Sequence, residues 1–153
     1  MRIGQGFDAH KIVEGDEVVL GGVHIPSNFS IIAHSDGDII IHAVIDAILG
    51  AFSLGDLGTH FPSEDKAYKS ISSRTLLREV LEKIGDQKVS NLDITYIGEE
   101  PKLSIYVDQI KKNLSKDLNI NIDQVSCKAT TTDGLGYQGR KEGVSALAII
   151  LFE

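Results

Sequence analysis

The stretch VSALAIILF at Val144–Phe152 decides the fold class of this chain, because it is apolar at nearly every position. In a strand, one face would carry Ala146, Ala148 and Ile150, and the other Leu147, Ile149 and Leu151. A strand that is apolar on both faces is usually buried on both sides. A single layer of helices covers only one face of a sheet, so we expect the chain to associate with copies of itself.

Outward from this strand, the chain alternates between strand-like and helix-like patterns. The further strands that we predict are Arg2–His10, Val18–Leu20, Val23–Ile25, Val89–Ile97 and Val125–Thr131. The helices that we predict are Asp38–Ala51, Ser73–Ile84 and a third that begins at Pro101 and continues through Leu114. This order predicts an α/β (α+β-like) fold in which helices cover one face of a mixed sheet. The 153 residues are about the length of one domain, spanning 1–153.

Local signals support these boundaries. Gly21-Gly22, between two short apolar runs, predicts a hairpin. Ser35, three residues before Asp38, is typical of a capping box with Asp in the place of Glu. Pro101 suits the first turn of the third helix.

Composition excludes several classes of protein. The net charge of −7 argues against a general nucleic-acid-binding protein. The sequence has no apolar run long enough to span a membrane. The single cysteine, Cys127, excludes an intramolecular disulfide, and the N-terminus lacks the apolar stretch of a signal peptide. We therefore expect a cytoplasmic protein that binds neither nucleic acid nor membranes.

A metal site is suggested by Asp8-Ala9-His10 together with His42. Residues two apart in a strand point to the same face, so Asp8 and His10 can converge on one ion, and His42 can add a third ligand from the first helix. Two imidazoles and one carboxylate form a catalytic zinc set with an open fourth position. On spacing alone, a chance pattern with an ordinary helical histidine is the stronger interpretation. Asp46 lies one turn after His42, where either could orient the other.

Three loops allow either a ligand site or an ordinary turn. Ala33–Asp38 precedes a helix N-terminus, which attracts phosphate, but it is equally consistent with a well-capped helix. Leu54–Asp65 is glycine-rich and acidic, and would bind sugar-like hydroxyls or simply be solvated. Lys128–Arg140 carries threonines and glycines that suit a diphosphate, and Asp133 suits Mg²⁺, yet a glycine turn after a strand explains it as well.

Taken together, these segments resemble one family. The matching motifs are RIGQGFDAH at 2–10, LGGVHIP at 20–26, AHSDGD at 33–38, LGDLG at 54–58 and KATTT at 128–132. In order and spacing they are similar to the 2-C-methyl-D-erythritol 2,4-cyclodiphosphate synthase family, nearly end to end. The resemblance implies a homotrimer whose sheets face each other, with active sites between subunits.

The resemblance also implies a phosphorus–oxygen lyase of non-mevalonate isoprenoid precursor synthesis. Its substrate would be a small cytidine diphosphate compound, 4-diphosphocytidyl-2-C-methyl-D-erythritol 2-phosphate, and its products the cyclic diphosphate and CMP. The location would be the cytoplasm, or the plastid stroma if a transit peptide has been removed.

Site residues follow from the same resemblance, position by position. One zinc ion per active site would be held by Asp8, His10 and His42, and Mg²⁺ or Mn²⁺ by Asp133. His34 and Thr131 match positions that stabilise the transition state. The residues that match substrate-binding positions are Asp8, His10, His34, Ser35, Asp56, Leu57, Gly58, Phe61, Pro62, Ser63, Glu64, Asp65, Gly98, Pro101, Lys102, Leu103, Thr130, Thr131, Thr132, Asp133, Tyr137 and Arg140.

The chain departs from the family pattern at several of these positions. Asp133 stands where a glutamate is usual, Ser63-Glu64 where aspartate or proline is frequent, and Gly98-Glu99-Glu100 where Ala-Gln is common before Pro-Lys. Two other functions remain open from the residues: a zinc phosphohydrolase, in which water attacks, and a non-catalytic trimer that only binds zinc and CMP.

Overall fold

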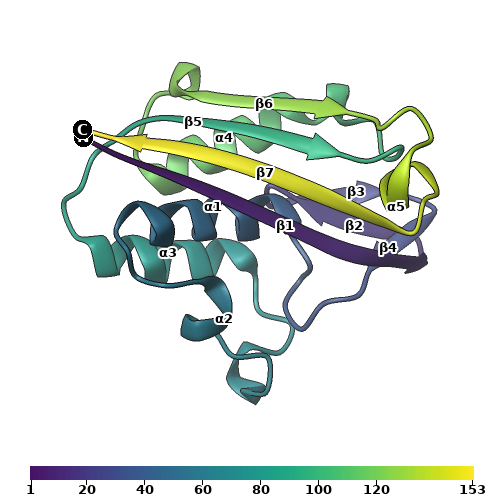
Figure 1. Ribbon diagram of the computed structural model, residues 1–153, viewed down its shortest axis with the longest axis horizontal. Helices are drawn as coiled ribbons and strands as arrows, with labels where there is room; N and C mark the ends of the chain where they lie inside the picture. Colours follow the sequence, from purple (N-terminus) through teal and green to yellow (C-terminus); the bar gives the residue numbers. More distant parts are fainter.

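A five-stranded mixed sheet with helices on one face forms the framework of the computed structural model, which describes residues 1–153 (Figure 1). Its strand order is β4-β1-β7-β5-β6. The strands are β1 Arg2–Glu14, β2 Glu17–Leu20, β3 Val23–Pro26, β4 Phe29–Ile31, β5 Val89–Ile97, β6 Val125–Thr130 and β7 Gly143–Phe152. The helices are α1 Ile39–Ala51, α2 Leu57–His60, α3 Ser73–Ile84, α4 Val107–Leu118 and α5 Gly136–Gly139, with 3₁₀ turns at Lys66–Tyr68, Leu103–Ile105 and Ile122–Gln124. The predicted fold class is confirmed.

Strand β7 lies at the centre of this sheet. It pairs antiparallel with β1 on one side and with β5 on the other, while β5 and β6 are parallel. The parallel pair is connected through α4, as a parallel crossover requires. Strands β2 and β3 form a separate hairpin, and both turn residues have positive φ, 58° at Gly21 and 71° at Gly22. The hairpin predicted from Gly21-Gly22 is therefore confirmed.

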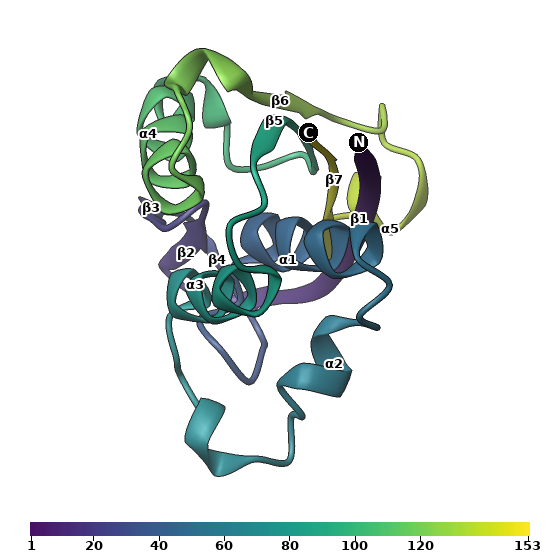
Figure 2. The same cartoon turned by 90° about the vertical axis from the view of Figure 1, so that its left-hand side faces the viewer.

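Helix α1 lies between the sheet and α3 (Figure 2). It packs on β1, where Gly4 and Gly6 leave no room for a side chain: a Cβ on either residue would lie within 2 Å of a carbonyl oxygen of α1. Nearly every residue of α1 is buried, and α1, the sheet, α3 and α4 contribute to one continuous core. No helix of the chain has both the length and the apolar character needed to cross a membrane.

The two faces of β7 differ in burial. The helix-facing residues Ala146, Ala148 and Ile150 are fully buried. On the opposite face Ile149 is 46% exposed, and its neighbours on β1, Ile3 and Phe7, are 68% and 51% exposed. Within one chain the strand is therefore covered on one side only, and burial of the second face by self-association stays a prediction.

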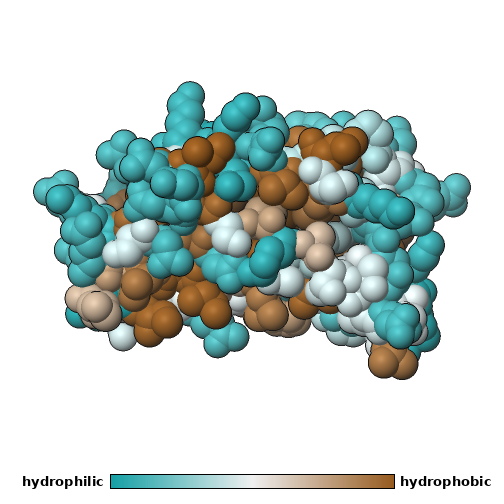
Figure 3. Space-filling model, turned by 90° about the horizontal axis from the view of Figure 1, so that it is seen from above, coloured by the Kyte–Doolittle hydropathy of each residue, from teal (hydrophilic) through white to brown (hydrophobic).

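Another side of the molecule has a mixed surface. Seen from above, near β6 and α4, hydrophobic residues lie between hydrophilic side chains rather than forming one continuous patch (Figure 3). The exposed apolar residues of β1 and β7 belong instead to the open face of the sheet.

Two sequence predictions about helix starts are wrong. The third helix begins at Val107, not Pro101, because a 3₁₀ turn over Leu103–Ile105 comes first and Tyr106 is the N-cap. The capping box at Ser35 does not form. Asp38 itself caps α1 by accepting a hydrogen bond from the Ile41 amide at 3.1 Å, and the Ser35 hydroxyl lies against His42 instead.

Candidate metal and substrate site

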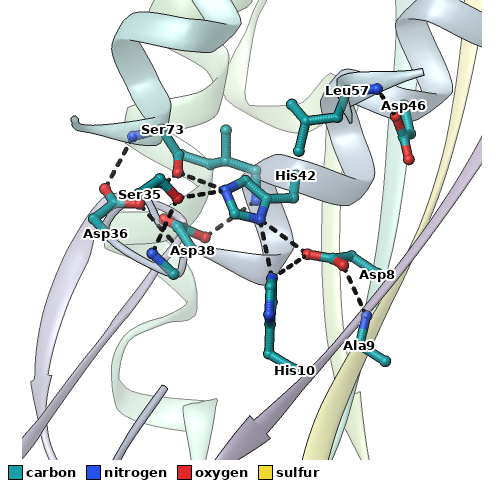
Figure 4. Close-up of polar contacts among 12 residues, drawn as sticks. Asp8, Ala9, His10, Ser35, Asp36, Asp38, His42, Asp46, Leu57 and Ser73 are labelled. Atoms are coloured by element: carbon teal, nitrogen blue, oxygen red, sulfur yellow. Dashed lines mark hydrogen bonds and ion pairs between the residues drawn. The ribbon is translucent and has the colours of Figure 1, made fainter. Parts of the chain in front are cut away.

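Asp8, His10 and His42 converge at the point where β1 passes α1 (Figure 4). The Asp8 carboxylate oxygen Oδ2 lies 3.0 Å from His10 Nε2 and 2.9 Å from His42 Nδ1. The two imidazole nitrogens lie 3.4 Å apart. Three donor atoms thus form a small triangle that opens on one side.

The triangle has the dimensions of a tetrahedral zinc site. Zinc binds imidazole nitrogen and carboxylate oxygen at about 2.0–2.2 Å, which places neighbouring ligand atoms roughly 3.3 Å apart. The three separations, from 2.9 to 3.4 Å, fit that value with little movement of the side chains. The residues present therefore fit the implied metal.

The local sequence explains this convergence. Asp8 and His10 are two residues apart on β1 and share the face that also carries Gly4 and Gly6, which is the face toward α1. Because Gly6 lets α1 approach the strand closely, the ring of His42 reaches the two strand residues.

The side chains of this cluster stabilise one another's charged forms. Burial opposes the Asp8 carboxylate, but hydrogen bonds and charge from His10 and His42 hold the pKa of Asp8 well below its usual range. Burial also opposes a charged His42, yet the hydrogen bond and charge of Asp8, with the charges of Asp38 and Asp36, raise the pKa of His42. The cluster therefore keeps an anionic carboxylate, which attracts a cation.

The far edge of the His42 ring faces two serines. His42 Nε2 lies 2.9 Å from Ser73 Oγ and 3.0 Å from Ser35 Oγ. The predicted partnership of His42 with Asp46 does not occur, because the Asp46 carboxylate instead accepts a hydrogen bond from the Leu57 amide at 2.7 Å. Asp46 thus holds the start of α2, and sequence spacing misassigned its partner.

A cavity of about 400 Å³ adjoins the triangle. Its lining residues are Asp8, His10, His34, Ser35, His42, Leu57, Gly58, Phe61, Pro62, Ser63, Glu64, Tyr68 and Leu76. The loops around it are tied together, since His34 Nε2 donates to the Asp65 carbonyl at 2.9 Å and its own carbonyl accepts from Ser70 N at 2.8 Å. Sequence reasoning missed Tyr68 and Leu76, whose patterns indicated nothing beyond packing.

Two acidic residues of the predicted pocket do not line this cavity. Asp56 and Asp65 are N-caps: Asp56 accepts from the amide and hydroxyl of Thr59, both at 2.8 Å, and Asp65 accepts from Ala67 N at 2.9 Å. Their carboxylates therefore already have partners within the chain.

The remaining predicted residues also lie away from this cavity. These are Gly98, Pro101, Lys102, Leu103, Thr130, Thr131, Thr132, Asp133, Tyr137 and Arg140. The Leu103 side chain is buried in the core at 1% exposure, so only its backbone can reach a ligand. Arg140 pairs with Glu142 at 3.0 Å, and Asp133 has a positive φ of 55° on the exposed loop after β6.

The residues that line the cavity and the predicted residues that lie outside it nevertheless occupy the same end of the sheet. Across β7, Ser145 pairs with Ala9 of β1 and with Ile97 of β5, and Ile97 pairs with Thr130 of β6. The loops that follow β5 and β6 therefore leave the sheet in the row that contains Ala9, next to the Asp8–His10 pair. One chain contributes both groups but does not join them in one cavity.

Comparisons with known proteins cover the whole chain. The YgbB family model matches residues 1–153. The 2-C-methyl-D-erythritol 2,4-cyclodiphosphate synthase of Methylococcus capsulatus is 51% identical over 152 residues, 98% of this chain and 96% of that protein. The IspF protein of Plasmodium falciparum in a CDP complex is 40% identical with a TM-score of 0.85, over 99% of this chain and 94% of that one. The bifunctional IspDF of Campylobacter jejuni is 36% identical with a TM-score of 0.92. The match covers 97% of this chain but only 41% of the IspDF chain.

Proposed function

The chain belongs to the YgbB family, and on that premise we propose that it is an enzyme that converts 4-diphosphocytidyl-2-C-methyl-D-erythritol 2-phosphate into 2-C-methyl-D-erythritol 2,4-cyclodiphosphate and CMP. The observation that supports this most strongly is the Asp8–His10–His42 triangle beside a cavity bordered by His34 and Ser35. The reaction belongs to non-mevalonate isoprenoid precursor synthesis, and its class is a phosphorus–oxygen lyase. We place the protein in the cytoplasm or in a plastid stroma.

The chemistry requires positioning more than covalent participation by the protein. An oxygen of the substrate's 2-phosphate attacks the β-phosphorus, and the bond from that phosphorus to the oxygen bridging the α-phosphorus breaks. CMP leaves with the bridging oxygen and its electron pair. Because both reacting groups belong to one molecule, holding them in an attack geometry supplies much of the rate enhancement. Zinc on Asp8, His10 and His42, with Mg²⁺ or Mn²⁺ at Asp133, would neutralise the phosphate oxygens that repel each other.

The chain's own residues have distinct roles in this scheme. The cavity lined by Leu57, Gly58 and the Phe61–Glu64 segment holds the methylerythritol part and excludes water from it. His34 borders the same cavity, and its Nε2 would exchange its hydrogen bond to the Asp65 carbonyl for one to a phosphate oxygen in the transition state. Thr131 would do the same from the loop after β6.

A homotrimer would complete the site. The triangle and its cavity come from one part of the chain, whereas the predicted cytidine and diphosphate residues, Gly98–Leu103 and Thr130–Asp133, lie outside that cavity. A second copy would supply the missing loops. The open face of the sheet, where Ile3, Phe7 and Ile149 are exposed, supplies apolar area for such an association.

The experiment that tests the proposal separates cyclisation from hydrolysis. The purified protein with Zn²⁺ and Mg²⁺ is incubated with the substrate in water enriched in ¹⁸O, and the products are analysed by mass spectrometry. Cyclisation introduces no solvent oxygen into either product. Incorporation of ¹⁸O into a linear 2,4-bisphosphate or into CMP would instead identify a phosphohydrolase, and complete recovery of the substrate would identify a binding protein.

A further inference from the structure

The ring of His42 is oriented by more than its neighbours in the triangle. The Ser73 hydroxyl, on the first residue of α3, lies 2.9 Å from His42 Nε2 and is itself hydrogen-bonded to the Asp36 carboxylate (Figure 4). Asp36 also accepts from the Ser73 amide at 3.0 Å. One carboxylate therefore holds Ser73 at both its backbone amide and its side-chain hydroxyl.

The direction of these hydrogen bonds is fixed by chemistry. An ionised carboxylate can only accept, so the Ser73 hydroxyl must donate its proton to Asp36. Its remaining lone pairs can then only accept, and the neighbouring nitrogen of His42 must donate. With zinc bound, a proton on Nε2 leaves the lone pair of Nδ1 for the metal. Nδ1 lies 2.9 Å from Asp8 in the triangle, and without a metal it donates to that carboxylate.

We infer that Asp36 and Ser73 form a positioning relay that holds His42 in the tautomer that binds metal through Nδ1. Metal-binding histidines commonly donate their second ring proton to a carboxylate or carbonyl, which fixes the ring and strengthens the ligand. Here a buried serine connects the ring to the carboxylate. The inference deepens the proposed function, because it concerns the zinc ligand set on which that function rests.

Ser35 offers an internal comparison at almost the same distance. Its hydroxyl lies 3.0 Å from His42 Nε2, but its oxygen accepts only from the Gly37 amide, at 3.3 Å, and no carboxylate fixes its proton. The Ser35 hydroxyl is free to donate or accept, so it cannot select a tautomer. Two serines with equal proximity are thus expected to differ in their effect on metal binding.

Burial shows why the relay depends on Ser73. Ser73 is fully buried and His42 is 4% exposed, so bulk water has little access to the position of the lost hydroxyl. Without it, Nε2 would have only the Ser35 hydroxyl, which can donate to it and favour the opposite tautomer, with the proton on Nδ1.

The test measures zinc affinity by competition with a coloured chelator, using the full-length protein. Ser73→Ala is expected to weaken zinc binding by about 10–100-fold, the usual effect of removing such a partner. Ser35→Ala is expected to change the affinity by less than about threefold, because it leaves the carboxylate-linked acceptor in place. Ser115→Ala, which removes a buried serine hydroxyl from α4 that bonds only to Lys112, controls for the loss of a buried hydroxyl. Equal losses for Ser73→Ala and Ser35→Ala, or no loss for Ser73→Ala, would overturn the inference.

A second measurement needs no variant and therefore does not depend on folding of Ser73→Ala. In the zinc-loaded wild-type protein, ¹⁵N-resolved NMR is expected to show a slowly exchanging proton on His42 Nε2, close to the β-protons of Ser73. Zinc bound through Nε2, with the proton on Nδ1, would contradict the relay. Neither experiment requires turnover, so an inactive protein that binds zinc with this pattern would remove the proposed reaction and leave the relay standing.

Discussion

Gly6 of β1 and Ala43 of α1 are so close that a Cβ on Gly6 would lie 1.9 Å from the Ala43 carbonyl oxygen. Ala43 directly follows His42, so this contact sets how near the proposed metal ligand of the helix comes to Asp8 and His10 on the strand. The fold and the candidate metal site are thus connected through one backbone contact.

Gly6→Ala is therefore expected to disturb packing and metal binding together. The new methyl group meets backbone rather than a flexible side chain, so α1 must shift, at a cost of about 3 kcal/mol or more in the free energy of unfolding. Zinc affinity should fall with it. Urea denaturation and chelator competition measure the two effects.

Gly50→Ala, a glycine-to-alanine change on α1 itself, is the matched control. Its Cβ would lie no closer than 3.7 Å to any neighbour, and Gly50 is exposed, so the substitution should stabilise the helix by about 0.5–1 kcal/mol. Similar losses of stability and zinc affinity in both variants would show that the close approach at Gly6 does not determine the geometry of the metal site.

The α3–α4 contact is expected to depend on Asp117. Its side chain is 2% exposed and accepts from Arg74 Nε at 2.6 Å and from Arg78 Nη2 at 3.0 Å. Asp117→Ala leaves the half-buried Arg74 unpaired, and because both arginines keep some contact with water, we expect a loss of about 1–3 kcal/mol in the free energy of unfolding. Lys116→Ala, at the exposed neighbouring position, should change it by less than about 0.5 kcal/mol. Equal effects of the two substitutions in urea denaturation would contradict this role.

Asp38 is expected to make the stability of the fold depend on pH, in a direction that its pKa shift determines. Burial raises its pKa to about 6, against the opposing hydrogen bonds from the Gly22, Gly21 and Ile41 amides. Between the ordinary carboxyl value of 3.8 and 6 the folded chain binds more protons than the unfolded chain, so this group adds stability as the pH falls. Relative to Asp38→Asn, the wild type should gain stability from pH 7 to pH 4.5, by at most about 1.4 kcal/mol per pH unit.

Chemical denaturation of zinc-free protein, at one protein concentration for both variants, measures this difference. A wild type that loses stability relative to Asp38→Asn on acidification would show that the three amides hold the pKa of Asp38 below 3.8 instead.

Sites formed between subunits predict complementation. Asp8→Asn and Thr131→Ala would each be inactive alone, because one lacks a zinc ligand and the other a phosphate donor. In trimers assembled from equal amounts of the two, each mixed trimer has one site with both residues intact, so random assembly restores roughly a quarter of wild-type activity. Activity no higher than that of the separate variants would place the whole site within one subunit.

The sequence predicted those parts of the molecule that depend on local pattern. The apolar spacing of Asp38–Ala51 and Ser73–Ile84 located two helices within a residue, because one stripe of each must face the core. Short elements such as α2 and β4 were missed, since each is held by tertiary contacts, as α2 is by Asp46. The start of α4 was misplaced because a proline is compatible with several turns, and here it precedes a 3₁₀ turn.

The candidate site also has residues that local sequence pattern predicted and residues that it could not predict. Asp8 and His10 could be paired from strand alternation, and His42 could be named as a third candidate from the first helix. The family resemblance then favoured a metal site over a chance pattern, and the structure places the three side chains together. Ser73 could not be found, because it lies 31 residues from His42 in the sequence and reaches it only when α3 packs beside α1. The relation between the cavity and the Thr130–Asp133 loop also lies beyond local pattern, since it depends on how copies associate.

The most direct test of the central claim is a phosphorus NMR assay of the protein with 4-diphosphocytidyl-2-C-methyl-D-erythritol 2-phosphate and Mg²⁺, run with and without a zinc chelator. We expect two mutually coupled signals of a cyclic diphosphate together with CMP, and we expect both to be lost when the chelator is present. Unchanged substrate in the presence of bound zinc, or turnover that the chelator does not affect, would contradict a cyclising enzyme built on Asp8, His10 and His42.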